Sequence, residues 1–208
     1  MLKPAGRRQP GTGQRGFTLI ELMVTITLLA LLLGLAAPAF TVWTRNAKVR
    51  TVSDTLQNGA RLAQTEAVRR NRQVVFFLSN DSTCDATTAP AANGPFWAIR
   101  SVALTAGDAA VTVQCGTVAD RAEGVGITGP TAICFNSAGR QVANASPGAG
   151  TATCTLDATG LSSYDVAMTG TARDGDRPLR VLVTLGGQVR QCDPARTLSA
   201  SAPDGCPT

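Results

Sequence analysis

The chain contains no histidine among its 208 residues. Histidine is the usual general base near neutral pH and a frequent zinc and haem ligand, so the common forms of those sites are excluded. The sequence also lacks a Cys-x-x-Cys pair, a G-x-S-x-G elbow and a glycine-rich phosphate loop with its lysine. Asp174 and Asp176 in "ARDGDRP" are too few for an EF-hand, so we expect a polar turn there. The sequence therefore predicts no enzyme, no cofactor and no metal site.

The excess of basic over acidic side chains is concentrated in the first residues of the chain. The formal net charge is +5, but residues 1–16 carry four basic side chains and no acid. The remainder is close to neutral, which disfavours nucleic acid as a partner. By the positive-inside rule the N-terminal arm stays in the cytoplasm and the C-terminal domain faces outward. Arg45, Lys48 and Arg50 lie beyond the apolar run and weaken this charge bias without reversing it.

The stretch from Leu22 to Thr44 contains 23 residues and no charge. As a helix it is about 34 Å long, at ~1.5 Å per residue, which is sufficient to span a membrane. Glu21 stands directly before this run, inside an otherwise apolar segment. A carboxylate so placed costs roughly 2.5–3.5 kcal/mol on insertion scales and requires an explanation.

Three interpretations of this N-terminus are open. A secretory signal peptide would end at Ala37-Pro38-Ala39, before Phe40, but its apolar run is unusually long and Glu21 is unexplained. A plain signal anchor leaves Glu21 equally unexplained. If the chain is instead cut between Gly16 and Phe17, the new ammonium group partners the Glu21 carboxylate, in the same chain or in a neighbour. Glu21 then sets the register in which membrane helices pack.

The stretch "GFTLIELMVTI" resembles the class III signal of type IV pilins and pseudopilins. The resemblance implies a leader peptide of residues 1–16, removed after Gly16 by a prepilin peptidase that also N-methylates Phe17. It also implies that Glu21 acts in filament assembly. The expected location is the bacterial inner membrane, crossed once, with the C-terminal domain in the periplasm and later in a pseudopilus or pilus.

Apolar spacing extends the helix beyond the membrane run, to about residues 18–70. One face carries small and branched apolar residues three or four apart: Val49, Val52, Leu56, Ala60, Ala63 and Ala67. We expect a transmembrane and assembly half at 17–44 and an amphipathic half at 45–72. Gly34 and Pro38 predict a kink or a locally unwound stretch.

From residue 73 to 208 the sequence favours strands separated by polar loops. The strand-like runs are "QVVFFL", "FWAIRSV", "VTVQC", "TAICF", "SYDVAM" and "RVLVTLGGQVRQC", the last with a hairpin turn at Gly186-Gly187. A long helix followed by such runs predicts an α+β fold in which the helix packs on an antiparallel β domain. The stretches "QNGARLAQTEAVRRNRQVVF", "TAICFNSAGR" and "GGQVRQC" are similar to segments of the GspH/FimT group of pilin-like proteins.

All six cysteines follow the apolar run, and an even number in a translocated domain favours disulfides over buried thiols. Six cysteines allow 15 connectivities. The pair Cys192–Cys206 would close the tail onto the last strand, and sequence proximity suggests Cys134–Cys154 and Cys84–Cys115.

The resemblance implies a structural subunit, a minor pilin or pseudopilin of a type II secretion pseudopilus or a type IV pilus. Its implied partners are other pilins or pseudopilins, the prepilin peptidase, the inner-membrane assembly platform and membrane lipid. The alternative is a DNA-binding minor pilin of a transformation pilus, with Arg180, Arg190 and Arg196 as candidate contacts. The Gly-Arg-x-Arg motif of such members reads Gly187-Gln188-Val189-Arg190 here, so one arginine is missing and DNA is not favoured.

Overall fold

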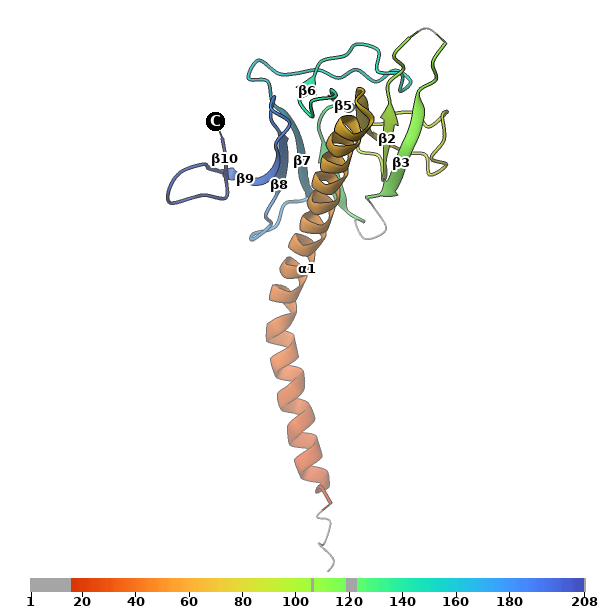
Figure 1. Cartoon of the computed structure of the whole chain (residues 1–208). Coiled ribbons are helices and arrows are strands. Elements are labelled where there is room, and N and C mark those ends of the chain that lie inside the picture. The colour runs from red at the N-terminus through yellow and green to blue at the C-terminus, as the bar shows by residue number, and fades with distance from the viewer. Residues whose placement is uncertain (1–15, 106, 119–122, 208) are drawn as a thin grey trace, which may run out of the picture. The chain divides into compact units, whose positions relative to one another are not determined.

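The computed structural model describes residues 16–105, 107–118 and 123–207. Its order of elements is one helix followed by short strands, as predicted from the sequence (Figure 1). The elements are α1 (Leu19–Arg70), β1 (Val74–Ser79), β2 (Phe96–Ser101), β3 (Val111–Thr117), β4 (Val125–Thr128), β5 (Ala132–Phe135), β6 (Gln141–Val142), β7 (Ser162–Met168), β8 (Leu179–Val183), β9 (Val189–Thr197) and β10 (Gly205–Cys206). The chain divides after Thr41 into two compact units.

The first unit consists of the N-terminal part of α1. Its segment Leu19–Ala37 is long and apolar enough to cross a membrane, and none of that segment is buried. The helix is continuous through Gly34 and Pro38, so the locally unwound alternative expected there is not observed. A kink at these two residues stays a prediction.

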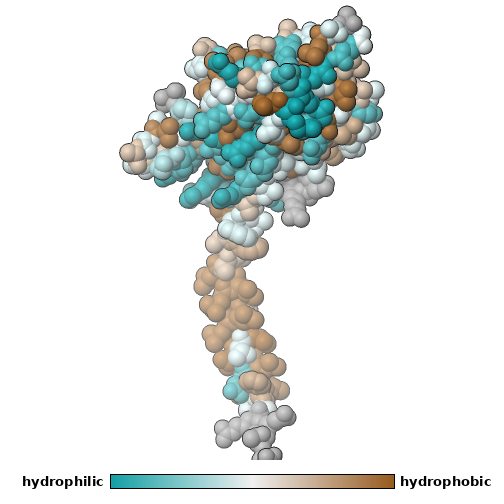
Figure 2. Space-filling model, in the orientation of Figure 1, coloured by the Kyte–Doolittle hydropathy of each residue, from teal (hydrophilic) through white to brown (hydrophobic). Residues whose placement is uncertain are grey.

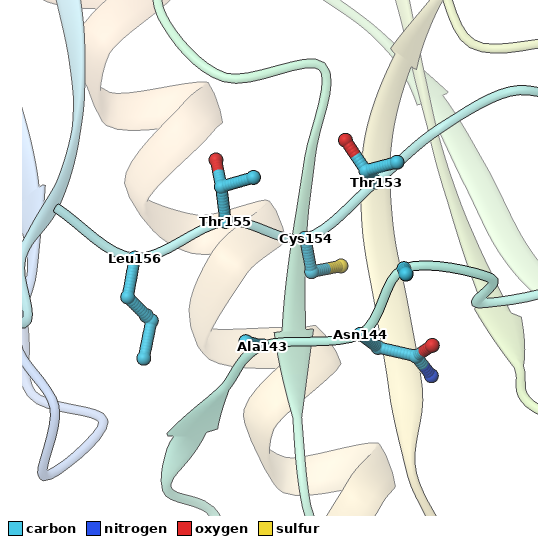
Figure 3. A pocket seen from close by; sticks show the side chains of 7 residues that line it. Ala143, Asn144, Thr153, Cys154, Thr155 and Leu156 are labelled. Carbon is cyan, nitrogen blue, oxygen red and sulfur yellow. The ribbon is translucent and has the colours of Figure 1, made fainter.

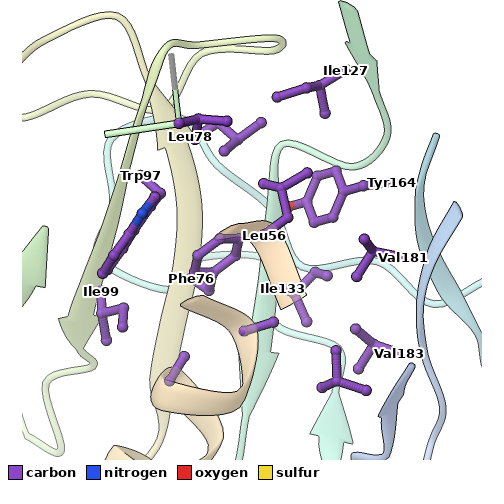
Figure 4. Packing of buried hydrophobic residues seen from close by; sticks show 14 of the residues in the cluster. Leu56, Phe76, Leu78, Trp97, Ile99, Ile127, Ile133, Tyr164, Val181 and Val183 are labelled. Carbon is purple, nitrogen blue, oxygen red and sulfur yellow. The ribbon is translucent and has the colours of Figure 1, made fainter. Parts of the chain in front are cut away.

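The second unit starts at Val42 and is organised around the rest of α1. The six apolar residues predicted to form one helix face are all buried, none more than 1% exposed. They pack against side chains from both sheets (Figure 4), among them Phe76 of β1 and Tyr164 of β7. The rings of Phe76 and Tyr164 meet edge to face, with centroids 6.2 Å apart, and so join the two sheets beneath the helix.

Two five-stranded sheets form the β domain. Their strand orders are β3-β2-β1-β5-β6 and β10-β9-β8-β7-β4. The sequence predicts an antiparallel domain, and every pair is antiparallel except β9–β10, which is parallel. This exception follows a turn in which Ser199 and Ala202 bond to each other, and the tail beyond it lies along β9.

Strand β1 is buried along its whole length, which explains its unbroken apolar sequence. Its inner side chains face α1, whereas Val75 and Phe77 belong to a second apolar cluster on the other face. Loop residues such as Ala149 and Ala152 complete that cluster. The long loops of the sequence therefore serve as the outer layer of the first sheet.

Candidate functional site

The first turn of α1 brings Thr18 and Glu21 together. The backbone N–H and the hydroxyl of Thr18 both donate to Glu21 Oε2, each at 3.2 Å. In return, the backbone N–H of Glu21 donates to Thr18 Oγ1, also at 3.2 Å. This reciprocal arrangement is a capping box, which satisfies backbone donors that a helix start otherwise leaves unpaired.

The capping box gives Glu21 a structural reason that the sequence interpretation missed. The signal was present in the spacing Thr18-Leu19-Ile20-Glu21, a Thr-x-x-Glu pattern before an apolar run. A negative charge in the first turn also interacts favourably with the helix dipole. Glu21 therefore has one partner in the uncut chain, and any role in assembly is additional to it.

Beyond Glu21 the apolar half of α1 satisfies its own polar groups. Thr25 Oγ1 donates to Leu22 O at 2.8 Å, and Thr27 Oγ1 donates to Met23 O at 3.0 Å. Hydroxyls that bond within their own helix are tolerated in lipid. The space-filling view shows an almost continuous apolar surface along this half of the helix (Figure 2). The segment is thus suited to a lipid or helix-bundle environment.

Gly16 and Phe17 precede the helix. A Cβ added at Gly16 would meet nothing within 4 Å, so local packing does not require glycine at this position. The Phe17 residue is 89% exposed. The junction is therefore accessible in this structure, whereas residues 1–15, the rest of the predicted leader, lie outside the described residues.

Residues 11–37 match the family model described as the prokaryotic N-terminal methylation motif. The chain carries a prepilin-type N-terminus. The match includes the Gly16–Phe17 junction, Glu21 and the apolar part of α1, and it confirms the resemblance found in the sequence. The signal peptide and plain anchor are therefore the weaker interpretations.

Comparisons over the whole chain give distant similarities. The type IV minor pilin FimU of Pseudomonas aeruginosa is 16% identical with a TM-score of 0.46, covering 76% of this chain and 97% of that chain. The minor pseudopilin EpsH from the type 2 secretion system of Vibrio cholerae is 12% identical with a TM-score of 0.45, covering 72% of this chain and 99% of that chain. No curated protein sequence matches this chain.

Three segments that follow the apolar run resemble the GspH/FimT group in sequence. They meet at one place in the second unit. Gln64 Nε2 of α1 donates to Gly139 O in the β5–β6 turn at 2.9 Å, and Gln141 N donates to Leu185 O in the β8–β9 turn at 3.1 Å. Gly187 has a φ of +87°, and a Cβ there would lie 1.9 Å from Gly139 O. These segments therefore join the helix to both sheets. The β8–β9 turn uses residues 184–188, longer than the predicted two-residue turn.

The structure pairs the cysteines as Cys84–Cys115, Cys134–Cys154 and Cys192–Cys206, the same three pairs suggested from the sequence. Each bond joins a strand to a neighbouring loop or to the tail. The first two fasten the loops that cover the outer face of the first sheet, and the third fastens β10 to β9. The disulfides thus stabilise the irregular parts of the domain.

Two of the candidate DNA-contacting arginines are neutralised within the domain. Arg180 forms a two-point ion pair with Asp165, with N–O distances of 2.6 and 3.0 Å, and hydrogen bonding to that carboxylate raises the pKa of the guanidinium. Arg196 pairs with Asp204 at 2.9 Å. Each cation faces its own acid, so neither offers an unopposed charge to a phosphate.

The third candidate, Arg190, donates through Nη2 to Gly205 O at 3.1 Å and so helps to hold the C-terminal tail. The neighbouring Gln188 supplies its backbone N–H to Thr184 Oγ1 at 3.2 Å in the β8–β9 turn. Both residues of the incomplete motif thus have structural partners. The described surface does not bring Arg180, Arg190 and Arg196 together as a basic patch free of acids.

A shallow hollow opens between two extended segments on the outer side of the first sheet (Figure 3). Its lining is Ala143, Asn144, Ala145, Thr153, Cys154, Thr155 and Leu156. Asn144 donates through its side chain to Gln73 Oε1 at 3.1 Å, and its backbone pairs with that of Cys154. With its cysteine in a disulfide and no ionisable group, this hollow offers no reactive side chain.

The turn at "ARDGDRP" is polar, as predicted, and is bound to α1. Asp176 accepts two hydrogen bonds from Arg45, at 2.8 and 2.6 Å. The Arg45 hydrogen bond lowers the pKa of the Asp176 carboxyl to about 2. Asp176 therefore acts as an anchor for the loop, and no cluster of metal-binding side chains is found among the described residues.

Proposed function

We propose that this chain is a minor subunit of a helical filament, either a type IV pilus or a type II secretion pseudopilus. The single observation that carries the proposal is the N-terminal methylation motif at residues 11–37. The described structure supports it with an apolar helix start whose surface is unburied, followed by a disulfide-bonded β domain. The role is structural, with α1 packed in a bundle and the β domain presented at its surface.

The precursor is held in the inner membrane by the segment Leu19–Ala37, and its β domain faces the periplasm. The basic N-terminal arm and the disulfides both favour this orientation. A prepilin peptidase removes residues 1–16 and methylates Phe17. The proposed partners are other filament subunits and the assembly platform of the inner membrane.

Cleavage gives Glu21 a second partner. The new ammonium group of Phe17 lies four residues before Glu21, and an opposite charge compensates the cost of a carboxylate in lipid. The same ammonium group on a neighbouring subunit offers the alternative pairing. Glu21 thus links processing to assembly, because the amine exists only after the cut.

The test is the mature N-terminus, determined by mass spectrometry of the protein isolated from its own membrane. The proposal predicts a chain that begins at N-methylated Phe17. A terminus at Phe40 would establish a secretory signal peptide, and an intact Met1 would establish a plain anchor. Gly16→Ala should reduce cleavage. The described structure leaves room for the added methyl group, so the loss would show that the peptidase, and not local packing, requires glycine at this position.

A further inference from the structure

The loop between β7 and β8 is fastened to α1 just beyond its apolar run. Asn46 Nδ2 donates to Gly175 O at 2.9 Å, and the backbone N–H of Arg177 donates to Asn46 Oδ1 at 2.8 Å. The ion pair between Arg45 and Asp176 lies beside these bonds. Two adjacent helix residues therefore fix the position of the loop through both its backbone and a side chain.

The loop also approaches the helix closely at Gly175. This residue has a φ of +86°, a conformation that favours glycine, and an added Cβ would lie 3.0 Å from Val42 Cγ1. The loop thus contacts Val42, Arg45 and Asn46. These residues come shortly after the candidate membrane span, which ends at Ala37.

Two cationic side chains of the β7–β8 loop remain exposed to solvent. Arg173 and Arg177 are both exposed, and neither lies within ion-pair distance of a carboxylate in the described part of the chain. Trp43 is 66% exposed and lies in the same helical turn as the loop's contacts Val42 and Asn46, and so at the same level along α1. An exposed tryptophan followed by cations, at the end of an apolar helix, is typical of the membrane–water interface.

We infer that Trp43, Arg173 and Arg177 form a surface that binds the headgroups of anionic phospholipids. The inference rests on the proposed function, because it requires the apolar half of α1 to be in a membrane. Nearby Lys48 and Arg50 add positive charge, against the acids Glu123 and Asp174, so the described surface is net basic. Basic residues near an anionic bilayer each favour binding by about fivefold, from roughly 1 kcal/mol apiece.

Two of the three cations that weakened the charge bias in the sequence, Arg45 and Lys48, have partners within the domain. Cations immediately after a membrane span are unusual on the outward side. Arg45 is neutralised by Asp176, and Lys48 Nζ donates to Glu123 O at 3.2 Å. Arg50 and the two loop arginines are exposed and are left to contact lipid.

The experiment uses the full chain reconstituted in vesicles of phosphatidylcholine and phosphatidylglycerol. One lipid at a time carries bromine high on its acyl chains, and quenching of tryptophan fluorescence measures which lipid lies beside Trp43. Trp97, the other tryptophan, is 8% exposed in the domain core and supplies a constant unquenched signal. We expect the anionic lipid to be enriched about three- to tenfold around Trp43.

The double variant Arg173→Gln/Arg177→Gln should reduce the enrichment to between one- and twofold. The matched control Arg69→Gln/Arg140→Gln removes the same charge at the C-terminal end of α1 and in the β5–β6 turn, and should leave the enrichment unchanged. No enrichment in the wild type, or equal loss in both variants, would overturn the inference. Insertion is checked separately by resistance to alkaline carbonate, and a chain that fails this check contradicts the proposed membrane anchorage instead.

Discussion

Thr18 and Glu21 hold each other through three hydrogen bonds across the first turn of α1. The carboxylate thus has a local role in starting the helix, in addition to the pairing with the Phe17 amine that we propose after cleavage. Glutamate and glutamine both complete a capping box, but only glutamate carries the charge that an ammonium group requires. The two roles can therefore be separated by substitution.

Glu21→Gln should retain the helix cap yet lose the charge, and we expect its incorporation into filaments to fall as far as that of Glu21→Ala. Membrane insertion should persist in both, because removing a charge from an apolar segment eases insertion. The measurement is crosslinking of each variant to wild-type subunits in isolated filaments. If Glu21→Gln assembles normally while Glu21→Ala does not, the carboxylate acts through the helix cap alone. Loss of such a cap lowers helix stability by about 1 kcal/mol.

Tyr164 is fully buried, and its hydroxyl has no hydrogen-bond partner among the described residues. An unpaired buried hydroxyl costs roughly 1–3 kcal/mol, so Tyr164→Phe should raise the free energy of unfolding by about 1 kcal/mol. The measurement is denaturant unfolding of the full chain in detergent. Ser162→Ala is the control, because buried Ser162 bonds to Gln141 and its loss should destabilise the domain. A decrease for Tyr164→Phe would reveal a bound water at the hydroxyl.

The Arg45–Asp176 pair predicts a specific acid sensitivity. The pKa of Asp176 is lowered to about 2 from 3.8 by its hydrogen bond to Arg45, so its contribution is present above pH 4. Protonation of the folded state removes this contribution as the pH falls from about 4 to 2. Asp176→Asn should therefore lower Tm at pH 6, and the difference from wild type should shrink toward pH 2. Asp174→Asn, an exposed neighbour, should change Tm little throughout, and an equal effect of both would contradict the anchor role.

The Cys192–Cys206 bond closes a loop with a sequence separation of 14 residues. Closing a loop of this size stabilises the fold by about 3 kcal/mol, because it reduces the chain entropy of the unfolded state. The double variant Cys192→Ser/Cys206→Ser should lose stability of that order in denaturant unfolding, while the other two bonds remain. Peptide mapping without reductant should show 192 joined to 206, and free thiols at both positions would contradict the pairing.

The apolar spacing of α1 sufficed to predict its extent and buried face, because a helix face repeats locally. Strands β4, β6 and β10 were not predicted. β6 and β10 have two residues each, and β4 pairs with β7 across a long connection, so little local signal exists. The separation into two sheets was missed for the same reason.

Arg100 shows a further limit of sequence reasoning. In "FWAIRSV" it has the position of an outward residue, yet it is 2% exposed. Its guanidinium donates to Asp85 O, Thr88 O and Gly148 O, at 2.9, 3.0 and 3.1 Å, and lies over the Phe77 ring. Burial lowers its pKa. Only the path of the covering loops reveals these acceptors, and that path leaves no local pattern in the sequence.

The short parallel strand β10 lies against the outer strand β9 of the second sheet. An unprotected sheet edge is a template on which another chain can add a strand, and neighbouring subunits in the filament that we propose would be such chains. The tail occupies part of this edge in the same molecule, and the Cys192–Cys206 bond makes that protection covalent. Oxidative folding would then do more than stabilise the subunit, because it would guard against sheet-to-sheet aggregation and leave association to the helices.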